Sequence, residues 1–372
     1  MKTLAPLRIL IWGNTFPCLG GVERFVDVLA HGIHARGHTL VVLSDGKSVD
    51  VLTDRPFPIK TIPMTVPIFG QDPLGILTSA SEARNFIEQF EPDVIHYNSS
   101  AVEMPIFVMS AMKMGIPIVK TLHSDLGNRA FLRKDGTFSK IVAASTRITT
   151  VSQHVHSLVP KVACLQGRTV QLIENSLPSD TSYVRPARRK RIFCLGRLVP
   201  EKGFDVLVSA MKIVVQTHAD ATLIIGGMGP EMESLKAQIV DLGLAKTVSL
   251  AGWILPDDVM SKMQEADIVA FPSRWEEPFG LVAIEAALAG RCCVASDVGG
   301  ISKNIETGVT GELVPPENAV VLAERLNVLL SDPEVCETQG RKAYDKYRSE
   351  GKFERMLDEY EQLFQDIAQA SS

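Results

Sequence analysis

Two carboxylates, Glu277 and Glu285, stand eight positions apart in the stretch SRWEEPFGLVAIEAALAG. The apolar residues in this stretch predict a helix that begins directly after Glu277, with Pro278 in its first turn and Gly290 as its stop. Eight helical residues rise about 12 Å, close to the span of a sugar joined to a ribose through a diphosphate. The helix start would attract the diphosphate, and each carboxylate can accept hydrogen bonds from sugar hydroxyls. The alternative is a dipole-favoured charge followed by a solvated helix residue.

Two cations stand five positions apart near the end of another apolar run. Arg197 and Lys202 lie in the sequence GRLVPEKGF, at and behind the end of a strand predicted at 192–198. Ligands of parallel α/β sheets bind at the carboxyl edge, where such a loop emerges. A guanidinium and an ammonium there can clamp a diphosphate and stabilise it as it leaves. A solvated basic loop is the alternative.

Further candidates follow other predicted strands. His123 ends a strand predicted at 116–123, which places it at a ligand edge; a structural histidine is the alternative. The pair Gly20 and Gly21 opens a helix, and the turn GGMGP, which includes Gly227, follows a strand. Glycine in both places would let the backbone approach a ligand closely. A plain turn without a ligand is the alternative for each. Neither has the Gly-x-Gly-x-x-Gly spacing of a dinucleotide site.

The elements that must position these residues alternate between strand and helix in two successive halves. The first half predicts strands at 7–13, 39–44, 93–98, 116–123, 147–152 and 170–175, and helices at 22–36, 79–90, 101–114 and 138–144. After a polar linker the pattern restarts with a strand at 192–198, a helix at 204–217 and a strand at 221–227, and further strands follow. This order predicts an α/β protein of two Rossmann-like, doubly wound domains, 1–180 and 188–350, facing a cleft.

The composition is that of an ordinary globular protein, with 372 residues, 45% hydrophobic and 22% charged, and a net charge of −5. Such a charge gives no indication of nucleic-acid binding. The six cysteines have no metal-ligand spacing, so we expect reduced thiols. The first residues lack the apolar core of a signal peptide, and no apolar run has the length of a membrane span. We therefore expect a cytoplasmic protein.

These motifs together resemble the retaining GT-B glycosyltransferases of family 4. The resemblance covers nearly the whole chain and is strongest in its second half. The strings GGVERFV, GRL with a later KG, GMGP and TLH match family patterns. The other matching residues are Pro272-Ser273, Glu277, Phe279-Gly280, Glu285 and Gly299-Gly300.

The resemblance implies a role for each matched residue. Arg197, Lys202 and the helix start would hold the donor diphosphate. Glu277 would bind the hydroxyls of the donor sugar and Glu285 those of the ribose. His123 would touch the donor sugar and support catalysis.

Other positions carry implied roles in donor binding. The loop with Gly20 and Gly21 would lie over the donor phosphates or near the acceptor. Trp253 would meet the base, with a buried core tryptophan as the alternative. A final helix, 351–372, would cross back to the first domain. The remaining donor-binding positions are Gly227, Phe279, Gly280 and Leu281.

Three segments depart from the family pattern. Glu174-Asn175-Ser176 stands where Pro-Asn-Gly is usual, and this change could alter the hinge. Cys292-Cys293 replaces a Pro-Val pair in a late strand. The loop that follows His123, SDLGNRAFLRKDG, has a length and sequence that belong to acceptor recognition. None of the three touches the diphosphate clamp.

We therefore expect a retaining transferase that moves a hexose from a nucleoside diphosphate sugar to a hydroxyl of a glycan, lipid-linked or small-molecule acceptor. The clamp carries the leaving charge and the chain lacks an Asp-x-Asp motif, so we expect no metal and no cofactor. The alternatives are a GT-B-type sugar-nucleotide 2-epimerase and a non-catalytic subunit that binds a sugar or a partner. Basic residues at 129–134 and 188–191 are compatible with peripheral contact on the inner membrane face; solvated segments are the alternative.

Overall fold

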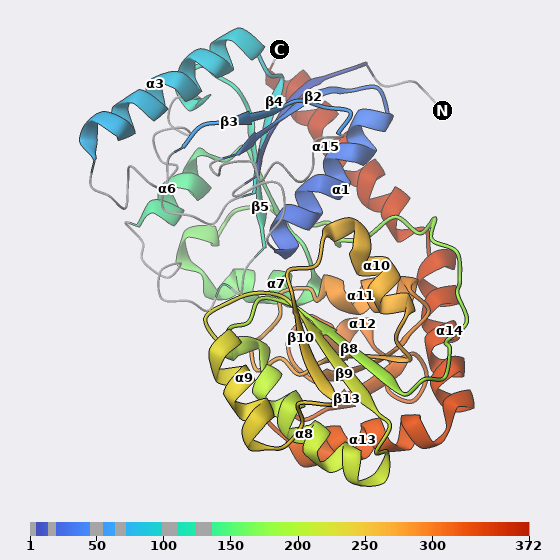
Figure 1. Cartoon of the computed structure of the whole chain (residues 1–372). Helices are drawn as coiled ribbons and strands as arrows, with labels where there is room; N and C mark the ends of the chain where they lie inside the picture. Colours follow the sequence, from blue (N-terminus) through green and yellow to red (C-terminus); the bar gives the residue numbers. More distant parts are fainter. Residues whose placement is uncertain are drawn as a thin grey trace. The chain divides into compact units, whose positions relative to one another are not determined.

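The chain forms two compact units, each built around one parallel sheet (Figure 1). The computed structural model describes residues 5–13, 20–44, 55–63, 72–98, 111–123, 126 and 136–371. The first unit comprises Met1–Asn175 and Phe353–Ser372, and the second comprises Ser176–Lys352. The chain therefore passes between the units twice, in the polar linker and near Lys352.

The first unit holds a seven-stranded parallel sheet in the order β3-β2-β1-β4-β5-β6-β7. Side chains of the inner strands are almost all buried, which is why these segments read as continuous apolar runs. The order reverses between β1 and β4, and such a switch point places ligand-binding loops at the carboxyl edge. The strands are β1 (Arg8–Gly13), β2 (Thr39–Ser44), β3 (Ile59–Thr61), β4 (Val94–Tyr97), β5 (Ile118–Leu122), β6 (Arg147–Thr150) and β7 (Val170–Leu172).

The helices of the first unit cover this sheet. They are α1 (Gly21–Ala35), α3 (Pro73–Phe90), α6 (Thr137–Ala144), α7 (Gln153–Leu158) and α15 (Lys352–Ser371), with short 3-10 turns at Val159–Lys161 and Ala163–Leu165. Helix α3 begins six residues earlier than its apolar pattern predicts, because Asp72 caps it by accepting a hydrogen bond from the Gly75 N–H at 3.0 Å. Most of the helix predicted at 101–114 lies outside the described residues.

Helix α15 comes from the end of the chain but packs into the first unit. Tyr360 and Phe364 are fully buried there. The Tyr360 hydroxyl lies 3.3 Å from the Thr121 hydroxyl at the end of β5, and Arg36, which follows α1, donates to Glu361 at 2.7 Å. These contacts attach the last helix to the core of the first unit.

The second unit holds a six-stranded parallel sheet in the order β10-β9-β8-β11-β12-β13. Its strands are β8 (Arg191–Leu195), β9 (Thr222–Gly226), β10 (Val248–Gly252), β11 (Ile268–Phe271), β12 (Cys292–Ser296) and β13 (Gly311–Val314). Its helices are α8 (Phe204–Thr217), α9 (Met232–Asp241), α10 (Pro256–Gln264), α11 (Leu281–Leu288), α12 (Ile301–Asn304), α13 (Ala319–Ser331) and α14 (Pro333–Ser349), with a 3-10 turn at Pro200–Lys202. Here the order reverses between β8 and β11.

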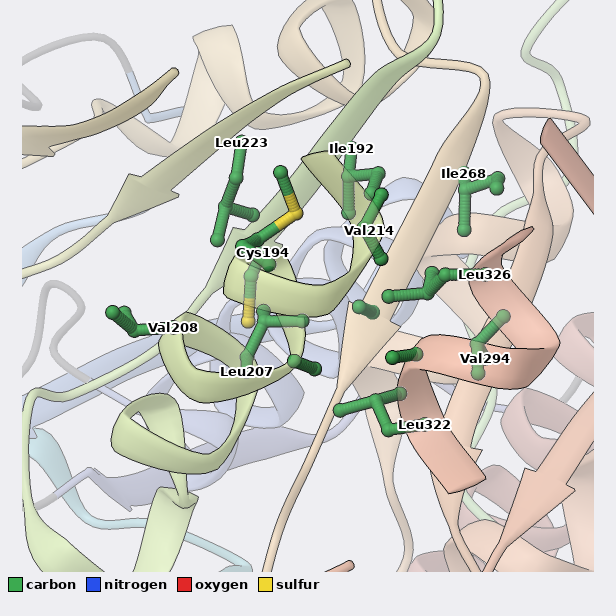
Figure 2. Packing of buried hydrophobic residues seen from close by; sticks show 14 of the residues in the cluster. Ile192, Cys194, Leu207, Val208, Val214, Leu223, Ile268, Val294, Leu322 and Leu326 are labelled. Atoms are coloured by element: carbon green, nitrogen blue, oxygen red, sulfur yellow. The ribbon is translucent and has the colours of Figure 1, made fainter. Parts of the chain in front are cut away.

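Apolar side chains from strands and helices fill the core of the second unit. Figure 2 shows Ile192 and Leu223 of the sheet packed with Leu207 of α8 and Leu326 of α13. Cys194 is part of this core. The described cysteines are all free thiols, and burial raises the pKa of Cys194 above its usual range, so the thiol stays protonated.

The linker after Asn175 has no regular structure up to β8, and its second part is fastened to the second unit. The carboxylate of Asp267 accepts hydrogen bonds from the backbone N–H groups of Arg188 and Arg191, at 2.8 and 3.0 Å. Glu337 pairs with the side chains of Arg185 and Arg188. These bonds make residues 185–191 part of the second unit rather than a free tether.

Candidate functional site

Glu277 is a buried carboxylate with two partners. It lies in the loop between β11 and α11, and its Oε1 accepts hydrogen bonds from Lys202 Nζ at 2.5 Å and from Ser273 Oγ at 2.6 Å. Only 12% of its side chain is exposed, against 27% for Lys202. Both bonds end on one oxygen, so Oε2 is the atom that can receive a further donor. Glu277 is therefore held by a cation and a hydroxyl rather than by the start of a helix alone.

The helix that follows starts later than predicted. Helix α11 begins at Leu281, and Gly280 precedes it in the left-handed conformation with φ 78°. Glu277 and Pro278 therefore lie in a loop, and the predicted 12 Å of continuous helix between the glutamates is wrong. The predicted stop is confirmed, since Gly290 follows α11 with φ 70°. Glu285 is half-buried on α11, one turn after its start.

The glycine pair 299–300 supports the loop that carries Glu277. The Gly300 N–H donates to the carbonyl of Glu277 at 2.5 Å, and a Cβ on Gly299 would lie 2.5 Å from the same carbonyl oxygen. Asn304 adds a side-chain hydrogen bond to the carbonyl of Phe279 at 2.6 Å. The role visible for this pair is therefore to hold the backbone next to the carboxylate.

Lys202 ends a short 3-10 turn, and the next residue brings its loop against the Glu277 loop. A Cβ on Gly203 would lie 2.0 Å from the carbonyl oxygen of Pro272, so only glycine allows this approach. The carbonyl of Glu201 accepts a hydrogen bond from the Arg274 N–H at 2.8 Å. Backbone contacts thus place two residues that are 75 positions apart in the sequence within hydrogen-bonding distance.

Arg197 differs from Lys202 in its surroundings. Its side chain is exposed in the loop after β8, and among the described residues it has no hydrogen-bond or ion-pair partner. The structure therefore pairs one of the two predicted clamp residues with Glu277 and leaves the other open to solvent at the same edge of the sheet. An unpaired guanidinium retains all its donors for an anion.

The glycine-rich turn after β9 has a structural role that accounts for its composition. Gly227 has φ 133°, and a Cβ there would lie 1.8 Å from the carbonyl oxygen of Gly196. Its N–H donates to the carbonyl of Gly252 at 2.7 Å. The glycine thus lets the loops after β8 and β9 and the end of β10 pack backbone against backbone. Trp253 follows Gly252 and is 43% exposed, which rules out the alternative of a buried core tryptophan.

His123 is a neutral, half-buried imidazole at the end of β5 in the first unit. Its Nε2 lies 2.9 Å from Asn98 Oδ1, and the ring of Phe25 packs edge-on against it at 4.8 Å. Burial, with Lys120 and His96 nearby, holds the pKa of His123 well below its usual value. With Asn98 accepting from Nε2, the tautomer leaves Nδ1 as a hydrogen-bond acceptor. The residue can bind a hydroxyl, but it does not supply a proton at neutral pH.

Gly20 and Gly21 stand at the start of α1, as predicted. Gly20 is extended, and the first turn of the helix contains the buried carboxylate of Glu23. A carboxylate there already receives part of the stabilisation that the helix dipole offers to anions. The loop before Gly20 lies outside the described residues.

Three supporting residues were not identified from the sequence as acting in the site. Asn98 fixes His123, Ser273 donates to Glu277, and Arg274 joins the two loops of the second unit. Ser273 belongs to the Pro-Ser pair of the matched motif, so its position carried a signal. The sequence gives no comparable indication for Asn98 or Arg274.

Metal and membrane features can be stated for the described residues only. Within them, no group of three or more His, Cys, Asp or Glu side chains is arranged to hold a metal ion. No described helix combines the length and apolarity of a membrane span. In the basic segment 188–191, Arg188, Lys190 and Arg191 each pair with a carboxylate of the second unit. The loop 129–134 lies outside the described residues.

Comparison with protein families assigns both halves of the chain. The family of glycosyl transferases group 1 matches residues 179–346, and glycosyltransferase family 4 matches residues 19–180. The chain belongs to the group 1 and family 4 glycosyltransferases. The predicted enzyme class is therefore confirmed.

Individual relatives of this glycosyltransferase match it along most of its length. Glycogen synthase of Mycobacterium tuberculosis is 25% identical over 390 residues, covering 92% of this chain and 91% of the relative. A GDP-mannose-dependent phosphatidylinositol monomannoside mannosyltransferase of the same organism is 25% identical over 362 residues, covering 87% and 89%. Anabaena HepE, solved in complex with UDP-glucose, has a TM-score of 0.80 at 21% identity, covering 97% and 100%. The GT-B fold, with two Rossmann-like sheets, is confirmed.

Proposed function

We propose that this glycosyltransferase moves a hexose, with retention of anomeric configuration, from a nucleoside diphosphate sugar to a hydroxyl of a glycan, lipid-linked or small-molecule acceptor. The observation that supports this most is the contact between Lys202 and Glu277 at the carboxyl edge of the second sheet. It joins a cation suited to a phosphate with a carboxylate suited to sugar hydroxyls. The names of relatives agree with such a donor, since one depends on GDP-mannose and HepE was solved with UDP-glucose.

The Lys202–Glu277 pair can remain intact when a donor binds. An ammonium has three hydrogen-bond donors, and Glu277 takes one of them. The others can reach phosphate oxygens, while Oε2 of Glu277 accepts from a hydroxyl of the sugar. Arg197 supplies a second cation from the same loop. Glu285 is assigned to the ribose, and His123 to a hydrogen bond with the donor sugar.

The proposed reaction needs only these contacts. The bond between the anomeric carbon and the diphosphate oxygen breaks with both electrons on the diphosphate, whose charge Lys202 and Arg197 stabilise. The acceptor oxygen forms its bond to the anomeric carbon on the same face, and its proton passes to a diphosphate oxygen. Retention rests on the family resemblance. The two cations take the place of a metal, so we propose a metal-independent enzyme without a cofactor.

A donor panel with two incubation arms tests the proposal. UDP-, GDP- and ADP-sugars are each incubated with a panel of glycan, lipid-linked and small-molecule acceptors, and separately without acceptor. We expect one donor to release its nucleoside diphosphate only when a suitable acceptor is present, with a glycosylated product of unchanged anomeric configuration. Formation of the 2-epimer from donor alone would instead identify an epimerase. Donor binding without release in any arm would identify a non-catalytic subunit.

A further inference from the structure

Arg274 contacts three separate parts of the second unit with one guanidinium. Its Nη1 donates to the carbonyl of Pro200 at 2.9 Å and to Asp205 Oδ1 at 2.7 Å, and Nη2 donates to Asp205 Oδ2 at 2.6 Å. Its Nε donates to Glu317 at 2.9 Å. All three guanidinium nitrogens are therefore used, and a quarter of the side chain remains exposed.

The bonded groups bracket the loop that carries Lys202. Pro200 begins the 3-10 turn that ends at Lys202, and Asp205 lies in the first turn of α8 directly after it. Arg274 itself stands three residues before Glu277. The guanidinium is planar and its donors are fixed in a fork, so a bidentate bond to Asp205 fixes orientation as well as distance. The Arg274 guanidinium also holds the pKa of Asp205 below its usual value, so the carboxylate stays charged throughout the neutral range.

We propose that Arg274 is a positioning residue that holds the Lys202 loop against the Glu277 loop, and so sets the geometry of the pair that receives the donor. This inference rests on the proposed function. Lys202 has a flexible side chain, so the place of its ammonium depends on where its loop is held. Because the contact of Lys202 with the diphosphate strengthens as the leaving group gains charge, misplacement should lower kcat more than it raises the donor KM.

A double-mutant cycle tests this inference. Arg274→Ala should lower kcat by roughly 30-fold and change the donor KM by less than about 3-fold. Arg274→Lys keeps the charge but loses the fork, and we expect it to recover only a small part of kcat. The matched control is Arg341→Ala, because Arg341 also binds a carboxylate through two contacts in the same unit, at Asp345, but lies on α14. The control should keep wild-type kcat.

Comparing the effect of Arg274→Ala with and without Lys202 separates a positioning role from a general contribution to stability. In a Lys202→Met enzyme, Arg274→Ala should change kcat/KM by less than about 2-fold, since the residue it positions is gone. An equal loss in both backgrounds would overturn the inference and assign Arg274 to stability alone. The midpoint of thermal unfolding gives a readout without turnover. With Arg274 present, the changes in this midpoint caused by Lys202→Met and by Glu277→Gln should not add up in the double variant. In the Arg274→Ala background the two changes should add up. Non-additivity that persists there would also overturn the inference. Absence of turnover in the wild type would count against the proposed function, whereas the thermal cycle would still report on Arg274.

Discussion

Replacing Glu277 by glutamine changes one atom of the site and leaves its shape intact. The amide oxygen can take the place of Oε1 and still accept from Lys202 and Ser273, which lie 2.5 and 2.6 Å from it. The amide nitrogen then replaces Oε2, so an acceptor becomes a donor where the sugar hydroxyl is proposed to bind. The variant therefore separates the folding role of the residue from its role with the sugar.

The two roles predict different magnitudes. For folding, the ion pair with Lys202 becomes a hydrogen bond from an ammonium to a neutral amide, and the bond from Ser273 loses its charged acceptor, which together should cost about 1–2 kcal/mol of unfolding free energy. For turnover, the substitution removes a negative charge that we propose lies beside the donor sugar, which becomes positive in the transition state. Losses of this kind lower kcat roughly 100-fold, or about 2.7 kcal/mol of activation free energy.

Steady-state kinetics with saturating acceptor, together with thermal unfolding, measure both effects. We expect Glu277→Gln to lower kcat about 100-fold with little change in the donor KM. Glu285→Gln should instead raise the donor KM about 10-fold with a smaller effect on kcat, because a ribose contact is the same in ground and transition states. The exposed neighbour Glu276 gives the matched control Glu276→Gln, which should leave both parameters unchanged. The same kinetic pattern in both variants, or loss of stability without loss of kcat for Glu277→Gln, would refute the assignment.

Three further predictions concern the clamp, metals and pH. Arg197→Ala and Lys202→Ala should each lower kcat/KM by roughly 100-fold or more in the same assay, and wild-type turnover in both would rule out the diphosphate clamp. Excess EDTA should leave donor turnover largely intact, whereas a complete loss that manganese restores would show that a metal neutralises the leaving group. Burial lowers the pKa of His96 to about 3, so the unfolded chain binds a proton that the folded one does not once the pH falls below about 6.5. The free energy of unfolding is measured with denaturant at about pH 7 and about pH 5.5, for the wild type and for His96→Gln. Over this range the wild type should lose about 1.3 kcal/mol more than the variant. Equal losses would contradict the buried, neutral state of His96.

The fold was predictable because its strands and helices alternate with clear periodicity. The strand at 39–44 and the helix at 204–217 have the predicted bounds, since each is apolar where it faces the core and ends at a polar residue or a turn. Short elements such as β3 were missed because three residues carry no periodic signal. The contacts of α15 with the first unit could be proposed only from the resemblance, because its apolar face would suit either sheet.

The sequence indicates candidate residues for the site but not the contacts between them. Lys202 and Glu277 were singled out separately, but a pairing between residues so far apart in the sequence leaves no local pattern. The start of α11 was misplaced because proline favours the first turn of a helix, whereas here Gly280 takes a left-handed conformation and delays the helix. The partners of Arg274 lie in two loops that the sequence describes only as polar.

The loop between Glu277 and α11 explains how the two glutamates can have different environments. On a continuous helix, side chains eight residues apart would differ by about 80° around the axis and would stay in a fixed relation. The loop removes this constraint, so Glu277 can turn toward Lys202 and Ser273 while Glu285 is held by α11. A loop needs support from elsewhere, and the Gly300 N–H provides it at the carbonyl of Glu277. The Arg274 guanidinium holds the facing loop of Lys202 through Pro200 and Asp205. Substitutions of Arg274 should therefore act through Lys202 on its pair with Glu277 and on kcat, and leave the proposed contribution of Glu285 to donor binding unchanged.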